Sequence, residues 1–152
     1  MRAVVQRAAW ARVKVDGEVV GELPPGASGL VALVGCERGD DLAAARYVVE
    51  KIVGLRIFSD PQGLMNLALN DVGGGLLLVS QFTLLGDCRK GRRPSFIDAM
   101  PGPEAADLLE WMVAHAKTLT PHVSTGRFQT HMHVELMNDG PVTLLVDSAR
   151  RF

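Results

Sequence analysis

Four consecutive residues that could take part in catalysis, Ser80-Gln81-Phe82-Thr83, follow directly after the apolar run 76–79. At the end of a buried strand the backbone leaves the sheet, so its N–H groups become free for a ligand. Such groups can hold a developing oxyanion, and loss of one donor typically costs about 2.7–4 kcal/mol of activation free energy. Because no His or Asp lies nearby in the sequence, the Thr83 hydroxyl is better suited to position a water than to attack directly. The alternative interpretation is a strand that simply ends in polar residues.

A second candidate is the segment Asn138-Asp139-Gly140-Pro141-Val142-Thr143, which lies between two apolar runs. Asn, Asp, Gly and Pro favour turns, so a plain hairpin connection is the simplest interpretation. A functional interpretation needs the carbonyls of Gly140 and Pro141 to face a ligand. Because only about 5–6% of X–Pro bonds are cis in folded proteins, the sequence alone favours a trans bond here.

A third candidate is a basic segment, Arg89-Lys90-Gly91-Arg92-Arg93, with four cations in five positions. The whole chain has 16 Lys and Arg against 17 Asp and Glu, a net charge of −1, so any nucleic-acid contact has to be a local patch of this kind. Each phosphate of a single strand that such a patch neutralises should steepen the salt dependence of binding by about 0.7 log units. The alternative is a solvated loop.

Two further patterns have residue types that could form a site. His131 and His133 flank Met132 on an expected strand, so both point away from the face of Met132, but no acidic residue or cysteine is placed to complete a metal site. Cys88 stands beside Arg89, where a cation favours the thiolate, yet it has no evident base partner. The sequence therefore predicts no metal and no cofactor, and a Cys88 thiol hydrolase remains an alternative.

Length and composition restrict the fold that positions these residues. A chain of 152 residues fits a single domain, 1–152, that buries roughly 68–70% of its unfolded surface. With 47% hydrophobic and 22% charged residues it is unlike a disordered chain, and its apolar runs are far shorter than the ~20 residues of a membrane span. Cys36 and Cys88 form no CxxC pair, so neither a zinc site nor a disulfide framework is indicated, which favours the cytoplasm.

Strands are expected in the first half of the chain. Residues 11–15 alternate between apolar and polar, and Asp16-Gly17 after them predicts a two-residue hairpin. The continuous apolar run 30–35 is typical of a strand covered on both faces. The run 76–79 is the most hydrophobic, which predicts a central strand. Further strands are expected at 55–58, 67–69, 132–136 and 142–146.

Two helices are expected as well. The first is capped by Asp40 or Asp41 and ends at Gly54; its apolar positions at helical spacing are Leu42, Ala45, Val49 and Ile52. The second follows the Pro-Gly-Pro of 101–103; its expected apolar stripe is Ala106, Leu109, Val113 and Ala116. Together the elements predict a mixed α/β domain with two main helices and about seven or eight mixed strands.

Several of these segments resemble the signature motifs of the D-aminoacyl-tRNA deacylase family. The matching runs are Ser80-Gln81-Phe82-Thr83-Leu84, Arg89-Lys90-Gly91-Arg92-Arg93-Pro94-Ser95-Phe96 and Asn138 to Thr143, with similar stretches at 1–7, 54–58 and 65–67. The resemblance covers essentially the full length, in order. It implies a homodimeric proofreading hydrolase with a compact, layered β/β/α fold, which frees tRNA from D-amino acids on its 3′-terminal adenosine.

The resemblance also implies how substrates are selected. In the family the active site lies at the subunit interface, where a Gly-cis-Pro turn of one chain enters the pocket of the other. The carbonyls of Gly140 and Pro141 would then receive the α-ammonium group and leave no room for an L side chain, whereas glycine would pass. Arg7 matches an arginine that braces this turn, and Met132 matches a methionine that lines the adenosine pocket.

For the chemistry, the resemblance implies that backbone N–H groups around Gln81 and Phe82 polarise the ester carbonyl, with Ser80 and Thr83 supporting their loop. The ribose 2′-hydroxyl of the substrate would assist the attacking water. The four cations of the basic segment would guide the tRNA acceptor end. The alternative is a module that binds nucleic acid through this segment without turnover.

Two stretches depart from the family pattern. Residues 128–132 read Phe-Gln-Thr-His-Met where the family usually has Phe-Gly-Ala, a variable residue and Met. The missing glycine is expected to stiffen or crowd the adenosine side. Residues 86–88 read Gly-Asp-Cys where Ala-Asp-Thr is common, which marks Cys88 as a tolerated replacement.

Overall fold

A computed structural model describes residues 1–151, which form eight strands and two α-helices. The strands are β1 (Arg2–Val15), β2 (Glu18–Glu22), β3 (Gly29–Gly35), β4 (Phe58–Ser59), β5 (Met65–Leu67), β6 (Gly75–Ser80), β7 (Val123–Thr125) and β8 (His133–Asp147). The helices are α1 (Leu42–Gly54) and α2 (Gly102–Leu119), with two short 3₁₀ helices, η1 (Asn70–Val72) and η2 (Phe82–Leu85). The predicted mixed α/β class is confirmed. Within residues 1–151, no helix is both long and apolar enough to cross a membrane.

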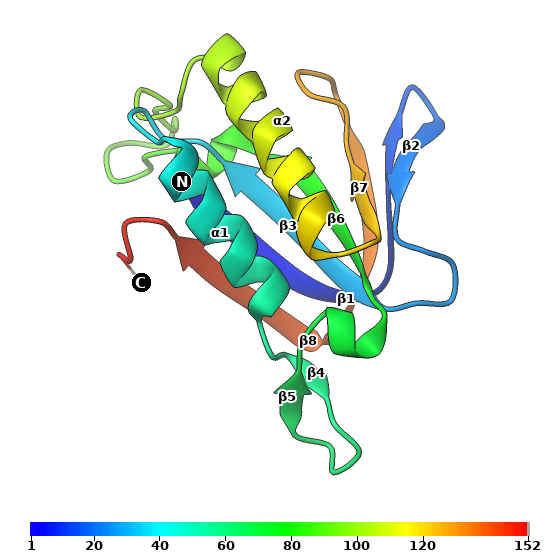
Figure 1. Cartoon of the computed structure of the whole chain (residues 1–152). Coiled ribbons are helices and arrows are strands. Elements are labelled where there is room, and N and C mark those ends of the chain that lie inside the picture. The colour runs from blue at the N-terminus through cyan, green and yellow to red at the C-terminus, as the bar shows by residue number, and fades with distance from the viewer. Residues whose placement is uncertain (152) are drawn as a thin grey trace.

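The main sheet is organised around the long strand β1 (Figure 1). Its strand order is β2-β1-β3-β6-β7, and β8 pairs with the other edge of β1. The first half of β1 therefore lies between β3 and β8, and its second half lies between β2 and β8. The sheet curls until β2 approaches β7, where a Cβ at Gly21 would lie 2.1 Å from the carbonyl oxygen of Thr125. Only glycine permits this near-barrel closure.

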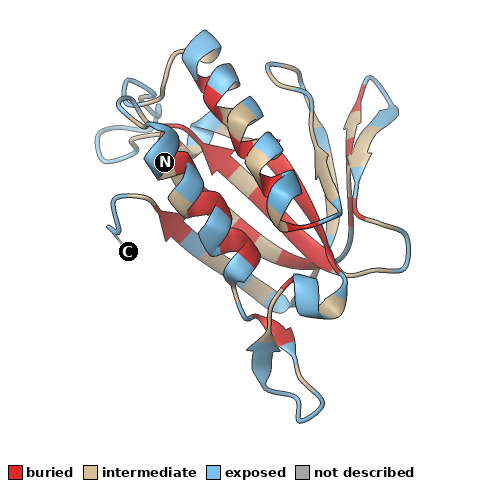
Figure 2. Ribbon diagram, in the orientation of Figure 1, coloured by how far each residue is buried: buried red, intermediate tan, exposed pale blue. Residues whose placement is uncertain are grey.

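Two hydrophobic cores lie on opposite faces of the sheet. Helices α1 and α2 cover one face, and their inward sides and the central strands carry most of the buried residues (Figures 1 and 2). A smaller core lies on the other face, inside the curl. Strand β6 serves both, because Leu76 and Leu78 pack in the first core while Leu77 and Val79 pack in the second. The prediction that 76–79 is a central buried strand is confirmed.

Local signals for turns and caps were also confirmed. Asp16 and Gly17 have φ values of 50° and 84° and connect β1 to β2 as a two-residue turn. Asp41 caps α1, where its carboxylate accepts a hydrogen bond from the Ala44 N–H at 2.9 Å. Helix α1 ends at Gly54. These features depend on residues close in sequence, which explains why they could be predicted.

The expected apolar stripes of the helices were partly wrong. Leu42 is 52% exposed, so α1 packs through its later turns. On α2, Ala116 is buried as expected, but the other buried positions are shifted by one residue, to Ala105, Leu108 and Met112. The expected positions 106, 109 and 113 are half-buried and line a cavity of about 320 Å³ between α2 and the sheet. Two adjacent apolar stripes on one helix leave its rotation ambiguous from sequence alone.

Strand boundaries differ from expectation in three places. Strand β1 begins at Arg2, although alternation was evident only from residue 11. The short strands expected at 55–58 and 67–69 are displaced to β4 and β5. The two strands expected at 132–136 and 142–146 are one continuous strand, β8, so the hairpin interpretation of 138–143 is wrong.

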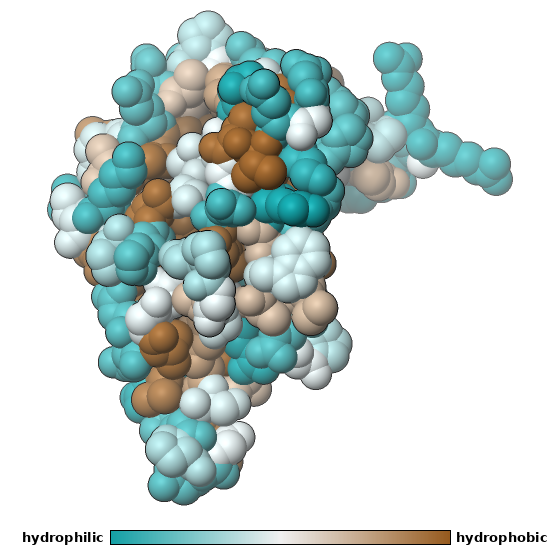
Figure 3. All heavy atoms as spheres, turned by 90° about the vertical axis from the view of Figure 1, so that its right-hand side faces the viewer, coloured by the Kyte–Doolittle hydropathy of each residue, from teal (hydrophilic) through white to brown (hydrophobic). Residues whose placement is uncertain are grey.

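The surface over the β2 and β7 edge shows small apolar patches separated by hydrophilic side chains, some of which project clear of the body (Figure 3). On this side the exposed apolar residues are thus dispersed. The first candidate segment instead borders a cleft, together with Met132.

Candidate active site

A cleft of about 810 Å³ lies where β6 ends, next to the start of α2 and the segment that leads into β8. Its wall includes Ser80, Gln81 and Phe82 from the first candidate segment, and Met132 from the proposed adenosine pocket. Further lining residues are Val34, Met100, Leu109, Phe128, Gln129 and His131. The structure therefore brings together two groups of predicted site residues that are about fifty positions apart in sequence. Phe128, which sequence reasoning did not choose, lines this cleft and the smaller cavity beside it.

The loop after β6 forms the 3₁₀ helix η2. The Gln81 N–H donates to the Val34 carbonyl at 2.7 Å, so it is not available to a substrate, contrary to expectation. The next two amides, of Phe82 and Thr83, belong to the first turn of η2, where N–H groups have no partner within the helix. Among residues 1–151 neither has an acceptor. Phe82 lines the cleft, so its N–H remains a candidate oxyanion donor.

The side chains of this loop hold one another. The Gln81 Nε2 donates to the Thr83 Oγ1 at 2.5 Å. Thr83 is exposed and Ser80 is half-buried at the end of β6. Thr83 is outside the lining of the cleft, which favours a supporting role for its hydroxyl over direct attack.

Strand β3 approaches η2 so closely that only glycine fits at Gly35. A Cβ there would lie 2.5 Å from Leu85 Cδ2 and 2.8 Å from the Gln81 carbonyl oxygen. Real Cβ atoms do not approach backbone oxygens this closely, so any side chain would displace the loop. Gly35 is therefore part of the support of the cleft, although nothing in its local sequence indicated this.

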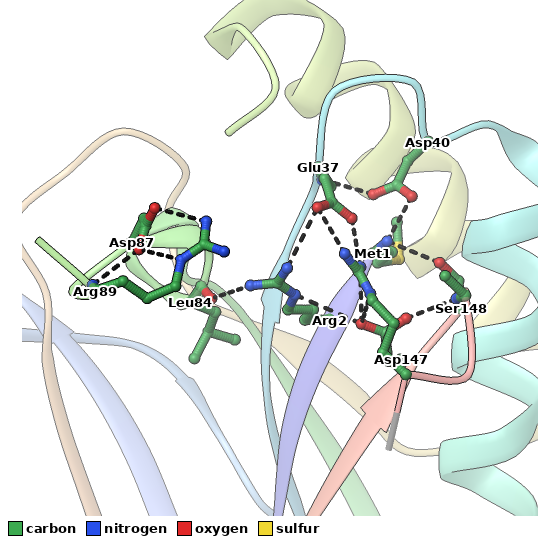
Figure 4. Close-up of polar contacts among 11 residues, drawn as sticks. Met1, Arg2, Glu37, Asp40, Leu84, Asp87, Arg89, Asp147 and Ser148 are labelled. Carbon is green, nitrogen blue, oxygen red and sulfur yellow. Dashed lines mark hydrogen bonds and ion pairs between the residues drawn. The ribbon is translucent and has the colours of Figure 1, made fainter. Parts of the chain in front are cut away.

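The far end of η2 is held by Arg2. Its Nη1 donates to the Leu84 carbonyl at 3.2 Å, and its Nη2 lies 3.3 Å from Glu37 Oε1 (Figure 4). Its Nε lies 3.5 Å from the buried carboxylate of Asp147. Arg151 joins the same group, with its Nη1 2.9 Å from Glu37 Oε1 and its Nη2 2.8 Å from Asp147 Oδ2. A cation beside the last carbonyls of a helix is favourable, so this network stabilises the C-terminal end of η2.

This network predicts a specific acid sensitivity. The hydrogen bond from Arg151 holds the pKa of Glu37 below its usual value. Burial alone would raise the pKa of Asp147, but hydrogen bonds from Arg151 and the Ala149 N–H outweigh it and lower that pKa. Carboxyls with lowered folded-state pKa values contribute stability above their unfolded pKa of about 4, and that contribution is lost as the pH falls further.

We expect the free energy of unfolding, measured by urea titration from pH 7 to pH 3, to fall steeply below about pH 4. Arg151→Met should lower the stability at pH 7 and flatten this acid limb, because the two carboxyls then lose less on protonation. An acid limb of unchanged slope in Arg151→Met would assign the acid sensitivity to other groups.

One departure from the family pattern, Gln129, lies on the side of the cleft that is expected to bind adenosine. Gln129 has a φ of 55°, in the left-handed region where glycine is unstrained. The family glycine suits this backbone, whereas here the Gln129 side chain extends over Gly102, where a Cβ would lie 2.3 Å from its Nε2. Met132 is accommodated in the same way, since a Cβ at Gly126 would lie 2.5 Å from its Sδ.

The second candidate segment forms a wide bulge in β8. The register with β1 passes from Gln6–Thr143 to Ala8–Asn138, so residues 139–142 stand opposite Arg7 alone. Asn138 closes the base of the bulge: its Oδ1 accepts from the Val142 N–H at 2.9 Å, and its Nδ2 lies 3.1 Å from Thr143 Oγ1. The turn residues thus form a bulge, and their composition suits a bulge as well as it suits a hairpin.

Arg7 braces the bulge from inside. Its Nε lies 3.1 Å from the Asp139 carbonyl and 3.0 Å from Asp139 Oδ2, and its Nη1 donates to the Ile57 carbonyl at 2.6 Å. Gly140 has a φ of 129°, and a Cβ there would meet Val142. The Gly140–Pro141 bond is cis, as the family resemblance implied and contrary to the frequency of X–Pro bonds.

The bulge is remote from the cleft of its own chain. Val134 is the last residue of β8 that lines the cleft, and Gly140 follows it by six residues, which at about 3.3 Å per residue is on the order of 20 Å. Residues 139–142 and Arg7 are outside the lining of the cleft. One protomer therefore does not bring the two candidate segments together.

The basic segment lies at the tip of an exposed loop, which an antiparallel bridge between Asp87 and Ser95 closes at its base. Arg89 pairs with Asp87, and its hydrogen bonds lower the pKa of that carboxyl to about 2. Lys90, Arg92 and Arg93 are exposed, and none of them has an acidic partner among residues 1–151.

Of the remaining candidates, only His131 lines the cleft. Cys88 is exposed on the basic loop, outside the lining of the cleft. The rings of His131 and His133 lie edge to face with centroids 5.0 Å apart. Within residues 1–151, no three His, Cys, Asp or Glu side chains are grouped as metal ligands.

Comparisons with known proteins bear on this geometry. The profile of the D-Tyr-tRNA(Tyr) deacylase family matches residues 4–147. A protein of Symbiobacterium thermophilum named D-aminoacyl-tRNA deacylase is 54% identical over 152 residues, covering 100% of this chain and 99% of the relative. One of Heliobacterium modesticaldum with the same name is 57% identical over 147 residues, covering 97% and 96%.

Solved structures share the fold. One described as c-Myc DNA Unwinding Element Binding Protein is 33% identical, with a TM-score of 0.90 over 97% of this chain and 98% of the other. Another, described as a probable eukaryotic D-amino acid tRNA deacylase, has a TM-score of 0.77 at 17% identity, covering 96% and 98%. At that identity the second likeness concerns the fold alone.

Proposed function

The chain belongs to the D-aminoacyl-tRNA deacylase family and is a hydrolase that acts on aminoacyl-tRNA, and on this premise we propose that main-chain carbonyls of Gly140 and Pro141 select its substrates by chirality. The observation that carries the proposal is the braced bulge of residues 139–142 opposite Arg7. The main-chain groups of such a rigid bulge are suited to contact the part of the substrate that all D-aminoacyl groups share.

Chiral selection requires only a modest difference in free energy between the two transition states, and rigid backbone groups are suited to provide it. A thousandfold preference between enantiomers corresponds to about 4 kcal/mol between their transition states. A side-chain pocket would restrict the enzyme to one amino acid, whereas every substrate offers the same α-ammonium group and the same Cα hydrogen. The Gly140 and Pro141 carbonyls would accept the ammonium group and exclude an L side chain. Glycine, which lacks a side chain, would be hydrolysed as well.

The same geometry supports a homodimer. The bulge lies on the order of 20 Å along β8 from the cleft wall of its own chain. A second protomer can bring its bulge to that cleft, which would place each active site at the subunit interface. The dimer is therefore a requirement of the proposed selection, and a monomeric enzyme with full chiral preference would contradict it.

For bond cleavage we assign the oxyanion contact to the Phe82 N–H, with the Thr83 N–H beside it. Both amides are free in the first turn of η2, and Phe82 lines the cleft. Ser80 and the Gln81–Thr83 side-chain pair would support the loop. No carboxylate belongs to the described lining of the cleft, which fits assistance of the attacking water by the ribose 2′-hydroxyl of the substrate.

The remaining proposed contacts concern the rest of the tRNA. Met132 and Phe128 would bind the terminal adenosine, and the exposed cations Arg89, Lys90, Arg92 and Arg93 would guide the acceptor end. Because its substrates take part in translation, we place the enzyme in the cytoplasm.

Hydrolysis of D-Tyr-tRNA and L-Tyr-tRNA, measured on the same tRNA at the same pH, tests the proposal. We expect a ratio of rates of about a thousand or more in favour of the D-ester, and Gly-tRNA should be hydrolysed too. Equal rates on the two enantiomers would contradict selection by the carbonyls. Rapid D-Tyr-tRNA hydrolysis with full protection of Gly-tRNA would instead indicate a pocket that recognises the side chain.

A further inference from the structure

An exposed pair of aromatic rings lies at the edge of the cleft. Phe82 and Phe96 meet edge to face, with centroids 5.2 Å apart and an interplanar angle of 66°. Phe82 is 59% exposed and Phe96 is 38% exposed. Phe82 lines the cleft, whereas Phe96 lies outside its lining, so the pair extends the site outward. Burial in the core of this chain does not account for either ring.

The backbone holds Phe96 in place from both sides. Before it, the Asp87 and Ser95 backbones exchange hydrogen bonds of 2.7 and 3.0 Å, which close the basic loop. After it, the Arg38 N–H donates to the Asp98 carbonyl at 2.8 Å, and the Arg38 Nε donates to the Ile97 carbonyl at 2.6 Å. The ring is therefore positioned before any ligand binds.

A glycine lets the ring lie against the start of the loop. A Cβ at Gly86 would lie 2.9 Å from Phe96 Cε1 and 3.0 Å from the Thr83 carbonyl oxygen. Any residue other than glycine at position 86 would therefore displace the Phe96 ring. This close contact links Phe96 directly to the loop of η2.

The positive charges near the aromatic pair favour the binding of a nucleic-acid strand. Phe96 lies next to the base of the loop that carries Lys90, Arg92 and Arg93, all exposed. Exposed aromatic rings beside a cationic track are the usual means of binding single-stranded nucleic acid, because every base has a face that can stack. An aromatic pair between the cleft and a cationic loop has this arrangement.

We propose that Phe82 and Phe96 form a stacking platform for the base of the nucleotide that precedes the terminal adenosine, with its phosphate directed toward the basic loop. This inference rests on the proposed function, which places the terminal adenosine in the cleft. The single-stranded acceptor end leaves the cleft past Phe82, so the next base meets the exposed ring of Phe96. Phe96 is thus a substrate-binding residue for the tRNA strand and has no part in bond cleavage.

Two substrates of different length test the platform. One is D-Tyr-tRNA, and the other is D-tyrosyl adenosine, which has the ester and the terminal nucleoside but no preceding nucleotide. Phe96→Leu keeps much of the apolar volume against Phe82 and removes the stacking ring, and Phe96→Tyr keeps the ring. We expect Phe96→Leu to raise KM for D-Tyr-tRNA about 5- to 100-fold with little change in kcat, and to leave D-tyrosyl adenosine unaffected. Phe96→Tyr should restore the KM for the tRNA.

Three results would overturn the platform. One is an equal loss on both substrates in Phe96→Leu, which would show that the ring only supports η2. Another is unchanged kinetics on both. The third is a change in sedimentation of Phe96→Leu, which would assign the ring to a contact between protomers. Failure of the proposed chiral selection would instead remove the preference for the D-ester over the L-ester on both substrates, in the unmodified enzyme.

Discussion

Gly35→Ala is expected to lower kcat for D-Tyr-tRNA about 100-fold in a protein that still folds. The added Cβ would lie 2.5 Å from Leu85 Cδ2 and 2.8 Å from the Gln81 carbonyl oxygen, so the loop of η2 has to move. Displacement of reacting groups by about 1 Å typically lowers the rate on the order of 100-fold, and loss of one oxyanion donor lowers kcat about 100- to 1,000-fold. The expected fall in kcat is of this size. Single-turnover hydrolysis measures the effect without interference from tRNA binding.

Gly54→Ala is the matched control for this variant. Gly54 ends α1, its φ is not in the left-handed region, and an added Cβ would have nothing within 4 Å. Its kcat should be unchanged. Gly35→Ala is also expected to lose about 1–3 kcal/mol of stability through overpacking, so urea titration has to show that it is folded at the assay temperature. A folded Gly35→Ala with normal kcat would contradict the assignment of the oxyanion contact to η2.

The position of Gly35 shows which parts of the site could not be predicted from sequence. Its requirement for glycine arises from Leu85 and Gln81, about fifty residues away, and nothing near Gly35 indicates a close approach. The same holds for the Gln81 N–H, which the sequence analysis treated as free because its partner, the Val34 carbonyl, belongs to another strand. Contacts between distant segments decide which donors remain available.

Segments with local patterns were predicted well. The buried strand at 76–79, the turn at Asp16-Gly17 and the cap at Asp41 depend on periodicity and side-chain chemistry within a few residues. The segment 138–143 has an equally clear composition, but turn residues serve a hairpin and a bulge alike. Only pairing with β1 makes it a bulge, and that pairing is more than 130 residues distant in sequence. The family resemblance, rather than composition, implied the cis bond at Gly140–Pro141.

Arg7 links that bulge to the body of the protein, and Arg7→Met is expected to weaken chiral selection more than bond cleavage. Arg7 is 9% exposed and holds the Asp139 carbonyl, the Asp139 carboxylate and the Ile57 carbonyl. Methionine has a similar length but provides no donors, so the bulge loses its brace. We expect the D-to-L rate ratio to fall at least tenfold, mainly because L-Tyr-tRNA is hydrolysed faster.

Stability separates this effect from simple unfolding. Buried polar groups that lose their partner typically cost about 1–3 kcal/mol, and we expect Arg7→Met to lose a similar amount of unfolding free energy. Arg56→Met is the control, because Arg56 is exposed and hydrogen-bonds only Asn66 in the β4–β5 hairpin, among the described contacts. It should keep both the rate ratio and most of the stability. A destabilised Arg7→Met with an unchanged D-to-L ratio would mean that groups other than the braced bulge distinguish the two enantiomers.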